Sequence, residues 1–281
     1  MTNRRASALL MAGGVLAGLL VFTAVFAPAL TSQDPKAISG AALERPSAKH
    51  RLGTDVPGRD IFAQLLYGAR ASLAVAVIGA AIALAGAVTI GVLPALLGGH
   101  SDAIATRLVV FLLALPGLPL LILIGSLAGE STIALILVIG FLGVAPNARI
   151  LRSQTLTLRH RGFVTAARGF GGGPLYVLWR HLLPGLGPYV VVGFVNWAGL
   201  AIALEAGLTF LGLGDPTGVS WGHTLNRALE QQSIYFSDMW AWWVLPSGLA
   251  ITLAVLGFTF VGVGLEPTFN HRWTRTWLRT T

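Results

Sequence analysis

The chain has 281 residues, of which 54% are hydrophobic and only 11% are charged, and its mean hydropathy is +0.74. This balance is too apolar for a soluble domain of this size, so a bilayer is the expected environment. The net charge of +8 does not indicate nucleic acid, because the basic residues lie in short stretches between long apolar runs, where membrane orientation explains them. Cysteine is absent, which excludes disulfides and cysteine metal sites.

Six apolar runs are long enough to cross a hydrocarbon layer of ~30 Å at about 1.5 Å per helical residue. In chain order they predict helices at 6–30, 71–97, 108–128, 131–148, 188–211 and 243–265. Backbone groups in lipid must pair within their own segment, and no alternating strand pattern is present. The predicted fold class is therefore an all-α integral membrane protein with six transmembrane helices.

The first run raises the question of a cleaved signal peptide. It follows Arg4 and Arg5, and Ala27-Pro28-Ala29 near its end resembles a signal-peptidase site. However, the apolar core of a signal peptide spans roughly 7 to 15 residues, and this run is long enough to cross the bilayer. We therefore expect a retained anchor.

Basic residues predict the orientation, because they accumulate on the cytoplasmic side. With the N-terminus inside, most arginines fall on the inner side, against only Asp102 and Glu266 as acidic residues there. The charges on the outer side nearly cancel. An even number of spans then places both termini in the cytoplasm.

Prolines predict where helices break. Pro116 and Pro119 are expected to kink or break the third span, Pro146 to end the fourth, and Pro184 to stop the helix that precedes the fifth.

Three connections are too long to be mere turns, and function is expected to concentrate in them: 31–70 outside, 149–187 inside and 212–242 outside. The first has apolar residues at helical spacing, which predict an amphipathic helix at the membrane interface. These residues are Ile61, Phe62, Leu65 and Leu66.

Charged and aromatic residues of the outer connections are expected to have structural roles, and each group has a functional alternative. Asp55, Arg59 and Asp60 are expected to form turn and ion-pair contacts, with contact to a substrate-delivery protein as the alternative. The tryptophans before the sixth span predict an aromatic belt rather than a ligand cage. They are Trp240, Trp242 and Trp243.

The inner connection predicts a helix, a turn and a second helix. Thr165 can cap or open the first helix, Gly171 and Gly172 permit left-handed backbone at its end, and Pro174 suits the first position of the next. On charge alone, a basic inner loop with an incidental helical hairpin explains the segment equally well.

A resemblance to a known family favours a function for this hairpin. The inner connection resembles the EAA motif, which is the cytoplasmic signature of ABC importer permeases. The residues that stand at its spacing are Ala166-Ala167, Gly171 and Leu183-Pro184. In that family the motif forms a coupling helix that docks into a cleft on the ATPase subunit. The resemblance therefore implies that the ATPase is contacted by Thr165, Ala166, Ala167, Arg168, Gly171, Gly172 and Pro174.

Further segments resemble the "C"-type permease subunits of the oligopeptide, dipeptide and nickel importers, from about His50 to Leu265. They are Gly53-Thr54-Asp55-Val56-Pro57-Gly58-Arg59-Asp60, Leu66-Tyr67-Gly68-Ala69-Arg70, Ser72-Leu73, Arg180-His181-Leu182-Leu183-Pro184, Glu205-Ala206, Phe210-Leu211-Gly212-Leu213-Gly214 and Ser220-Trp221-Gly222. The chain departs from the family in having Thr165 where Glu is usual and Val263 where Asp is common, and in Glu266-Pro267.

The resemblance implies a type I ABC importer permease in a bacterial or archaeal inner membrane. Residues 1–70 would be an anchor with an external segment, 71–265 a five-helix core that includes the coupling loop 149–187, and 266–281 a cytoplasmic tail. Implied partners are a second homologous permease, one or two P-loop ATPase subunits that bind ATP and Mg²⁺, an external substrate-binding protein, and lipid. The implied cargo is peptides; nickel chelates or other small solutes are the alternative.

Two polar residues inside the spans are candidates for the translocation path. Glu205 must face protein or water, because a charge at the bilayer centre costs roughly 2.5 to 3.5 kcal/mol on insertion scales. A structural carboxylate near the outer helix end is at least as good an interpretation. Asn196 lines the same path or bonds between helices.

Other function classes are disfavoured. The six histidines are scattered over loops without metal-ligand spacing, and no Gly-x-Ser-x-Gly turn supports a membrane enzyme. The chain lacks a phosphate-binding Gly-x-x-x-x-Gly-Lys loop, so ATP hydrolysis must fall to another chain, and we expect no cofactor on this one. A homo-oligomeric channel is the remaining alternative, although it would need no docking hairpin for a motor.

Overall fold

The apolar runs form helices. The computed structural model describes residues 3–128 and 131–269, and this part contains two isolated β-bridges but no strand. The predicted fold class is thus confirmed, while residues 270–281 of the predicted cytoplasmic tail lie outside the described residues. The elements are α1 (Asn3–Leu30), α2 (Ile61–Ala87), the π-turn η1 (Val88–Val92), α3 (Leu93–Leu97), α4 (Gly99–Ala114), α5 (Gly117–Ala128), α6 (Thr132–Leu158), α7 (Gly162–Gly169), α8 (Pro174–Val177), the π-turn η2 (Leu178–Leu182), α9 (Leu183–Phe210), α10 (Trp221–Glu230), the 3₁₀ turn η3 (Gln232–Tyr235), α11 (Met239–Trp242) and α12 (Val244–Phe269).

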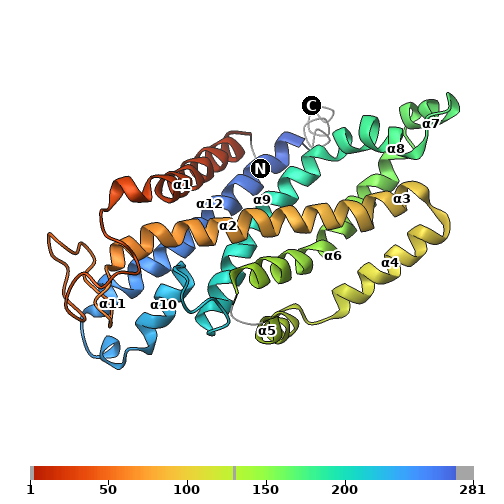
Figure 1. Ribbon diagram of the computed structural model, residues 1–281. Coiled ribbons are helices and arrows are strands. Elements are labelled where there is room, and N and C mark those ends of the chain that lie inside the picture. Colours follow the sequence, from red (N-terminus) through yellow and green to blue (C-terminus); the bar gives the residue numbers. More distant parts are fainter. Residues whose placement is uncertain (1–2, 129–130, 270–281) are drawn as a thin grey trace.

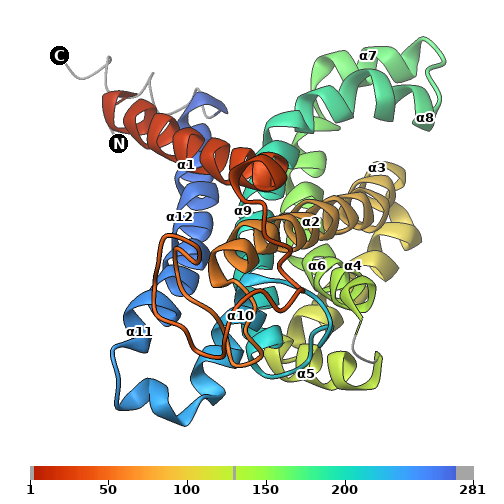
Figure 2. The same ribbon diagram turned by 60° about the vertical axis from the view of Figure 1, so that its left-hand side comes forward.

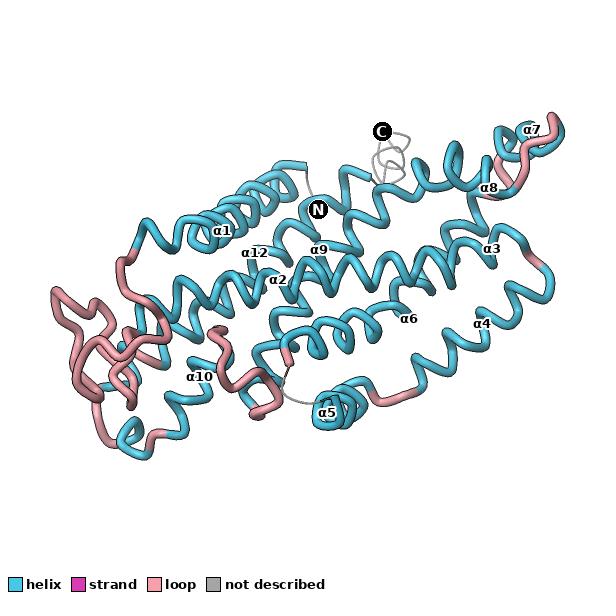
Figure 3. The backbone as a smooth tube through the Cα atoms, in the orientation of Figure 1, coloured by secondary structure: helices cyan, strands magenta, loops and turns pink. Residues whose placement is uncertain are grey.

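The long helices run along one axis of the molecule (Figure 1). One end carries α7 and α8, and we call it the hairpin end. The opposite end carries residues 31–60 together with 211–243, which we call the cap, and most of the loop segments gather there (Figure 3). The rotated view shows α1 and α12 together on the side of the bundle away from α4 and α5 (Figure 2).

Five helical segments of the described chain are long and apolar enough to cross a bilayer, and a bent pair makes six if it counts as one span. The five are Arg5–Leu30, Ile61–Leu97, Thr132–Leu158, Pro174–Phe210 and Met239–Glu266. Each covers one of the predicted spans to within one residue. Ile61 and Leu66 are buried in the first turns of α2, so residues 61–66 are continuous with the second span rather than a separate interfacial helix.

The third predicted span is the bent pair. α4 and α5 meet at an angle of 86°. Leu115 has extended backbone, with φ −73° and ψ 136°, because the ring of Pro116 disfavours a helical conformation in the preceding residue. The predicted break at Pro116 is therefore confirmed, and Pro119 is tolerated in the first turn of α5, where its missing N–H costs no helix bond.

Two other prolines do not end their helices, so those predictions were wrong. Pro146 lies inside α6, which continues to Leu158. Pro184 follows η2, in which the N–H of Leu183 donates to the carbonyl of Leu178, five residues earlier. Such a wide turn moves the backbone away from the proline ring, which would clash with the carbonyl four residues earlier in a regular helix.

Contact between α1 and α2 depends on a carbonyl that a proline leaves free. Pro28 has no N–H, so the carbonyl of Ala24 loses its helical donor. Arg70 of α2 replaces this donor: its Nε donates to the oxygen of Ala24 at 2.6 Å and its Nη2 to that of Val25 at 3.2 Å. The guanidinium also lies 5.0 Å from the ring centroid of Tyr67, which orients it.

Replacing Arg70 by Leu should therefore loosen the last turns of α1. The expected result is faster hydrogen exchange at residues 24–30. A charge-assisted hydrogen bond contributes about 1 to 3 kcal/mol, and the bond of the exposed Arg70 side chain lies at the low end of that range. Hydrogen exchange followed by mass spectrometry measures this, and the first turns of α1 serve as an internal control. The exchange rate in Arg70→Lys should fall between those of the wild type and Arg70→Leu. Unchanged exchange in Arg70→Leu would contradict the role of Arg70 as the donor to Ala24.

The cap has an aromatic core. Trp242 and Trp243 stack with ring centroids 6.5 Å apart, and they pack with Ile61 and Ile234. Trp243 is fully buried, whereas 54% of Trp240 is exposed. The predicted aromatic belt is thus wrong for Trp242 and Trp243, because the cap supplies them with protein neighbours.

Candidate functional site

The inner connection folds as the predicted helical hairpin. α7 ends in a glycine turn in which the N–H of Gly172 donates to the carbonyl of Ala167 at 2.8 Å. Gly171 has φ +85°, in the left-handed region that favours glycine. Pro174 opens α8, where the absence of its N–H costs no helix bond.

Thr165 does not cap this hairpin, contrary to the prediction. α7 begins at Gly162, and the extended residue before it is Arg161, whose carbonyl accepts the first helical bonds from Val164 and Thr165. The Thr165 hydroxyl lies 3.5 Å from the same carbonyl, at the limit of a hydrogen bond. Thr165 therefore presents an exposed side chain one turn into the helix.

Two arginines and a buried valine hold the hairpin to the rest of the molecule. Arg168 Nη2 donates to the carbonyl of Leu96 at 3.1 Å, and Arg159 Nη1 donates to that of Ala95 at 2.7 Å. Both acceptors lie in the last turn of α3, where helix carbonyls lack partners. Val164 is fully buried in the core cluster beneath. The hairpin is thus fastened to the end of α3.

The free side of the hairpin is a shallow groove of about 530 Å³ with an aromatic rim. It is lined by Phe163, Ala167, Phe170, Gly171, Gly172, Gly173, Tyr176 and His181. Phe170 at the tip is 91% exposed, and Ala166 beside the groove is exposed. Exposed large apolar side chains around small residues mark a surface that a partner protein covers.

Glu205 is buried between helices. Its exposure is 2%, and Ser72 of α2 donates its hydroxyl to Oε2 at 2.9 Å. The Thr209 hydroxyl donates to the backbone carbonyl of Glu205 at 2.8 Å, and the Ser220 hydroxyl at the start of α10 faces the carboxylate. These contacts join α2, α9 and the start of α10, as a structural carboxylate would.

Asn196 lies in a different environment. Nine residues separate it from Glu205, which is about 2.5 turns at 3.6 residues per turn, so the two side chains point to opposite faces of α9. Asn196 lines a cavity of about 350 Å³ between α6, α9 and α12. The cavity is lined by Asn147, Ile150, Leu151, Pro188, Tyr189, Val192, Gly193, Asn196, Gly262, Val263 and Glu266. The structure does not bring the two path candidates together.

Asn147 is a polar cavity residue that the sequence reasoning missed. Its Nδ2 donates to the carbonyl of Gly143 at 2.8 Å within α6, and the side chain is 7% exposed. An amide in an apolar run next to Pro146 was the available signal. α12 comes close enough to seat Asn196 against Gly262 because Gly262 has no side chain.

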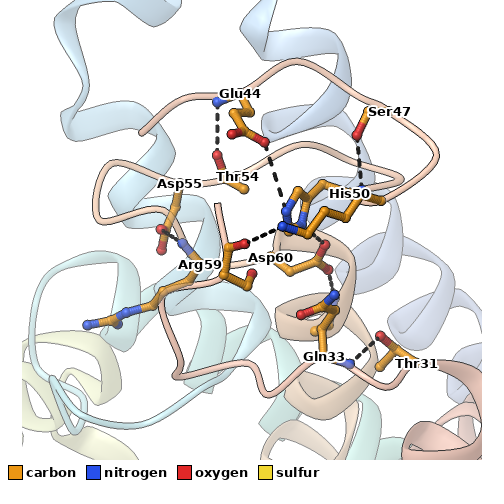
Figure 4. Close-up of polar contacts among 12 residues, drawn as sticks. Thr31, Gln33, Glu44, Ser47, His50, Thr54, Asp55, Arg59 and Asp60 are labelled. Atoms are coloured by element: carbon orange, nitrogen blue, oxygen red, sulfur yellow. Dashed lines mark hydrogen bonds and ion pairs between the residues drawn. The ribbon is translucent and has the colours of Figure 1, made fainter. Parts of the chain in front are cut away.

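The cap holds a second buried polar cluster around Asp60 (Figure 4). Asp60 Oδ1 accepts the N–H of Ala63 at 2.7 Å and caps α2, while Oδ2 lies 2.8 Å from Nδ1 of the fully buried His50. Asp55 accepts the backbone N–H of Arg59 at 2.7 Å. The expected turn contacts are thus present, whereas the Arg59 side chain forms no ion pair within the described residues. No sequence signal indicated that His50 would contact Asp60. Within the described residues, no group of three or more His, Cys, Asp or Glu could hold a metal ion.

The chain is similar in sequence to known proteins. Residues 87–275 match the family model described as binding-protein-dependent transport system inner membrane component. A putative peptide permease protein of Brucella suis is 39% identical over 263 residues, which cover 92% of this chain and 86% of the relative. A dipeptide transport system permease protein of Alkalihalophilus pseudofirmus is 34% identical over 265 residues, covering 92% and 85%. A probable D,D-dipeptide transport system permease protein of Escherichia coli is 32% identical over 270 residues, covering 95% and 89%.

Proposed function

Because this chain belongs to the family of binding-protein-dependent transport system inner membrane components, we propose that it is a permease subunit of an ATP-driven peptide importer. It is a multi-pass protein of the inner membrane and a transport subunit. The observation that carries the coupling role is the hairpin of α7 and α8, which presents an aromatic groove on one side and is bonded to α3 on the other.

The family implies a substrate-binding protein and ATPase partners. In our proposal a second homologous permease completes the pathway, and one or two P-loop ATPases that bind ATP and Mg²⁺ sit at the hairpin end. The hairpin end and both termini face the cytoplasm, and the cap faces outward, where the binding protein delivers cargo. The basic residues near the hairpin support this orientation.

Coupling in this proposal follows from how the hairpin is attached. ATP-driven closure of the ATPases displaces α7, and Arg168 and Arg159 pass that displacement to α3 at the end of α2. The hairpin meets the ATPase through a surface made by Thr165, Ala166, Ala167, Gly171, Gly172 and Pro174. Rigid elements that move together turn a local contact into a change of access for the whole pathway. We propose that Asn196 lines this pathway, and we keep Glu205 as a candidate with a structural role.

The test is purification of the tagged chain from native membranes in detergent, followed by identification of its partners and uptake by the reconstituted complex. We expect a second permease, P-loop ATPases and ATP-dependent uptake of di- or oligopeptides in the presence of the binding protein. Recovery of the chain alone or as a homo-oligomer would contradict the proposal and favour a channel. Uptake of nickel chelates without peptides would change the cargo but keep the architecture.

A further inference from the structure

Two arginines of the cap contact Asp55, Arg227 through its side chain and Arg59 through its backbone N–H. Arg227 of α10 lies 3.8 Å from Asp55 through Nη1, and Arg59 precedes the Asp60 cap of α2. The pair belongs to segments 168 positions apart in the chain (227 − 59), which the cap fold brings together. Figure 4 shows the Arg59 side chain extending away from the Asp60 cluster.

Asp55 is already occupied by other donors. Its Oδ1 accepts the backbone N–H of Arg59 at 2.7 Å, and its Oδ2 accepts Nε2 of Gln64 at 2.8 Å. The side chain of Asp55 is 1% exposed, so both carboxylate oxygens are buried inside the cap with these donors. Its single negative charge can offset only one of the two guanidinium charges.

Arg59 is left without a partner for its charge. Within the described residues its guanidinium makes no hydrogen bond and no ion pair, and its Nε is buried. A buried donor of a charged group that finds no acceptor in the protein is costly, so a water, an ion or a ligand that accepts from it lowers that cost.

Arg227 lies near Arg59, because both residues contact the side chain of Asp55. Burial and then the positive charge of Arg59 lower the pKa of Arg227, while Asp55 and Glu230 oppose the shift. Arg227 also donates Nη2 to the carbonyl of Pro216 at 3.2 Å, which fixes its position. Glu230 is exposed and forms no ion pair in the described residues, so the two guanidiniums retain excess positive charge.

We propose that Arg59 and Arg227 form a carboxylate-binding site in the cap, and that it receives the C-terminal carboxylate of the arriving peptide. This rests on the proposed function. Guanidinium groups bind carboxylates through paired, charge-assisted hydrogen bonds. Every linear peptide with a free C-terminus carries this group, so such a site holds peptides without reading their sequence. The side chain of Arg227 is only 19% exposed, which suits a small terminal group better than a flat protein surface.

The experiment compares uptake of a peptide with uptake of its C-terminal amide by the reconstituted complex. Both are supplied at the same concentration of loaded binding protein, with loading measured separately. For the wild type we expect about tenfold slower uptake of the amide, because a charge-assisted contact is lost. For Arg59→Gln the acid should slow to the level of the amide, so that the two rates agree within about twofold.

Arg59→Lys and Arg45→Gln are the matched variants. Arg59→Lys retains the charge and should keep part of the preference for the acid. Arg45 lies in the same cap but pairs with exposed Asp238 at 3.2 Å, so Arg45→Gln should behave as wild type. A loss that is equal for acid and amide in Arg59→Gln would overturn the proposal, and would assign Arg59 to the cap fold or to the binding protein. Wild-type uptake of the two peptides at equal rates would overturn it while leaving peptide import intact, whereas absence of any peptide uptake would overturn the proposed function as well.

Discussion

Gly171→Asp should abolish peptide uptake while the subunit still inserts and assembles its transmembrane bundle. Gly171 lines the groove of the hairpin and is exposed, and a Cβ added to it would meet no atom within 4 Å, so the substitution disturbs no internal packing. In the docked complex the carboxylate would be buried without a partner. A charge left unpaired in this way costs about 3 to 5 kcal/mol, which corresponds to a loss of docking of more than about 100-fold.

The matched control for this variant is Gly171→Asn. Asn has nearly the same shape as Asp and shares its tolerance for the left-handed backbone at φ +85°, but it carries no charge. ATP-dependent uptake and co-purification of the ATPases are measured for both. We expect the Asn variant to retain most activity. Wild-type uptake in Gly171→Asp would refute the docking role, and an equal loss in both variants would assign the effect to the turn conformation.

Asp60→Ala should cause the largest loss of stability among single changes in the cap. The substitution removes the cap of α2, worth about 1 kcal/mol, and leaves His50 fully buried without its partner. Breaking a buried pair from one side typically costs about 3 to 5 kcal/mol. Thermal unfolding of the purified complex should show a clear fall in the apparent melting temperature.

Asp60→Asn separates the two contributions of Asp60. Its amide oxygen can still accept the N–H of Ala63, but the negative charge beside His50 is lost. We expect a melting temperature between those of wild type and Asp60→Ala. A melting temperature of Asp60→Ala equal to that of the wild type would show that His50 and the α2 cap contribute little to the cap fold.

The sequence predicted the parts of this protein that depend on local patterns. Apolar run length is sufficient to predict long helices, because lipid leaves the backbone no alternative. The turn at Gly171 and the start of α8 at Pro174 were predictable because each depends on the residue itself. Thr165 was misassigned because Arg161, which has no typical capping side chain, begins the helix through backbone bonds alone.

The remaining differences arise from contacts distant in the chain. Pro146 and Pro184 were expected to stop helices, yet α6 continues past the first and a π-turn carries the chain through the second. Trp243 appeared suited to a membrane interface, but residues of the cap bury it. The link between His50 and Asp60 depends on how the external segment folds back, which no local spacing specifies.

The bond between Arg70 and the end of α1 also bears on how the subunit is made. α1 leaves the ribosome before α2, and its free carbonyl at Ala24 has no donor until a residue 46 positions later has been synthesised. α1 on its own is therefore an incomplete helix in the bilayer, and the arginine of α2 is in turn an expensive group to place near lipid without an acceptor. Each segment lowers the cost of placing the other, so the two should integrate into the membrane as a pair, and the first stable product of translation should be α1 with α2 rather than α1 alone.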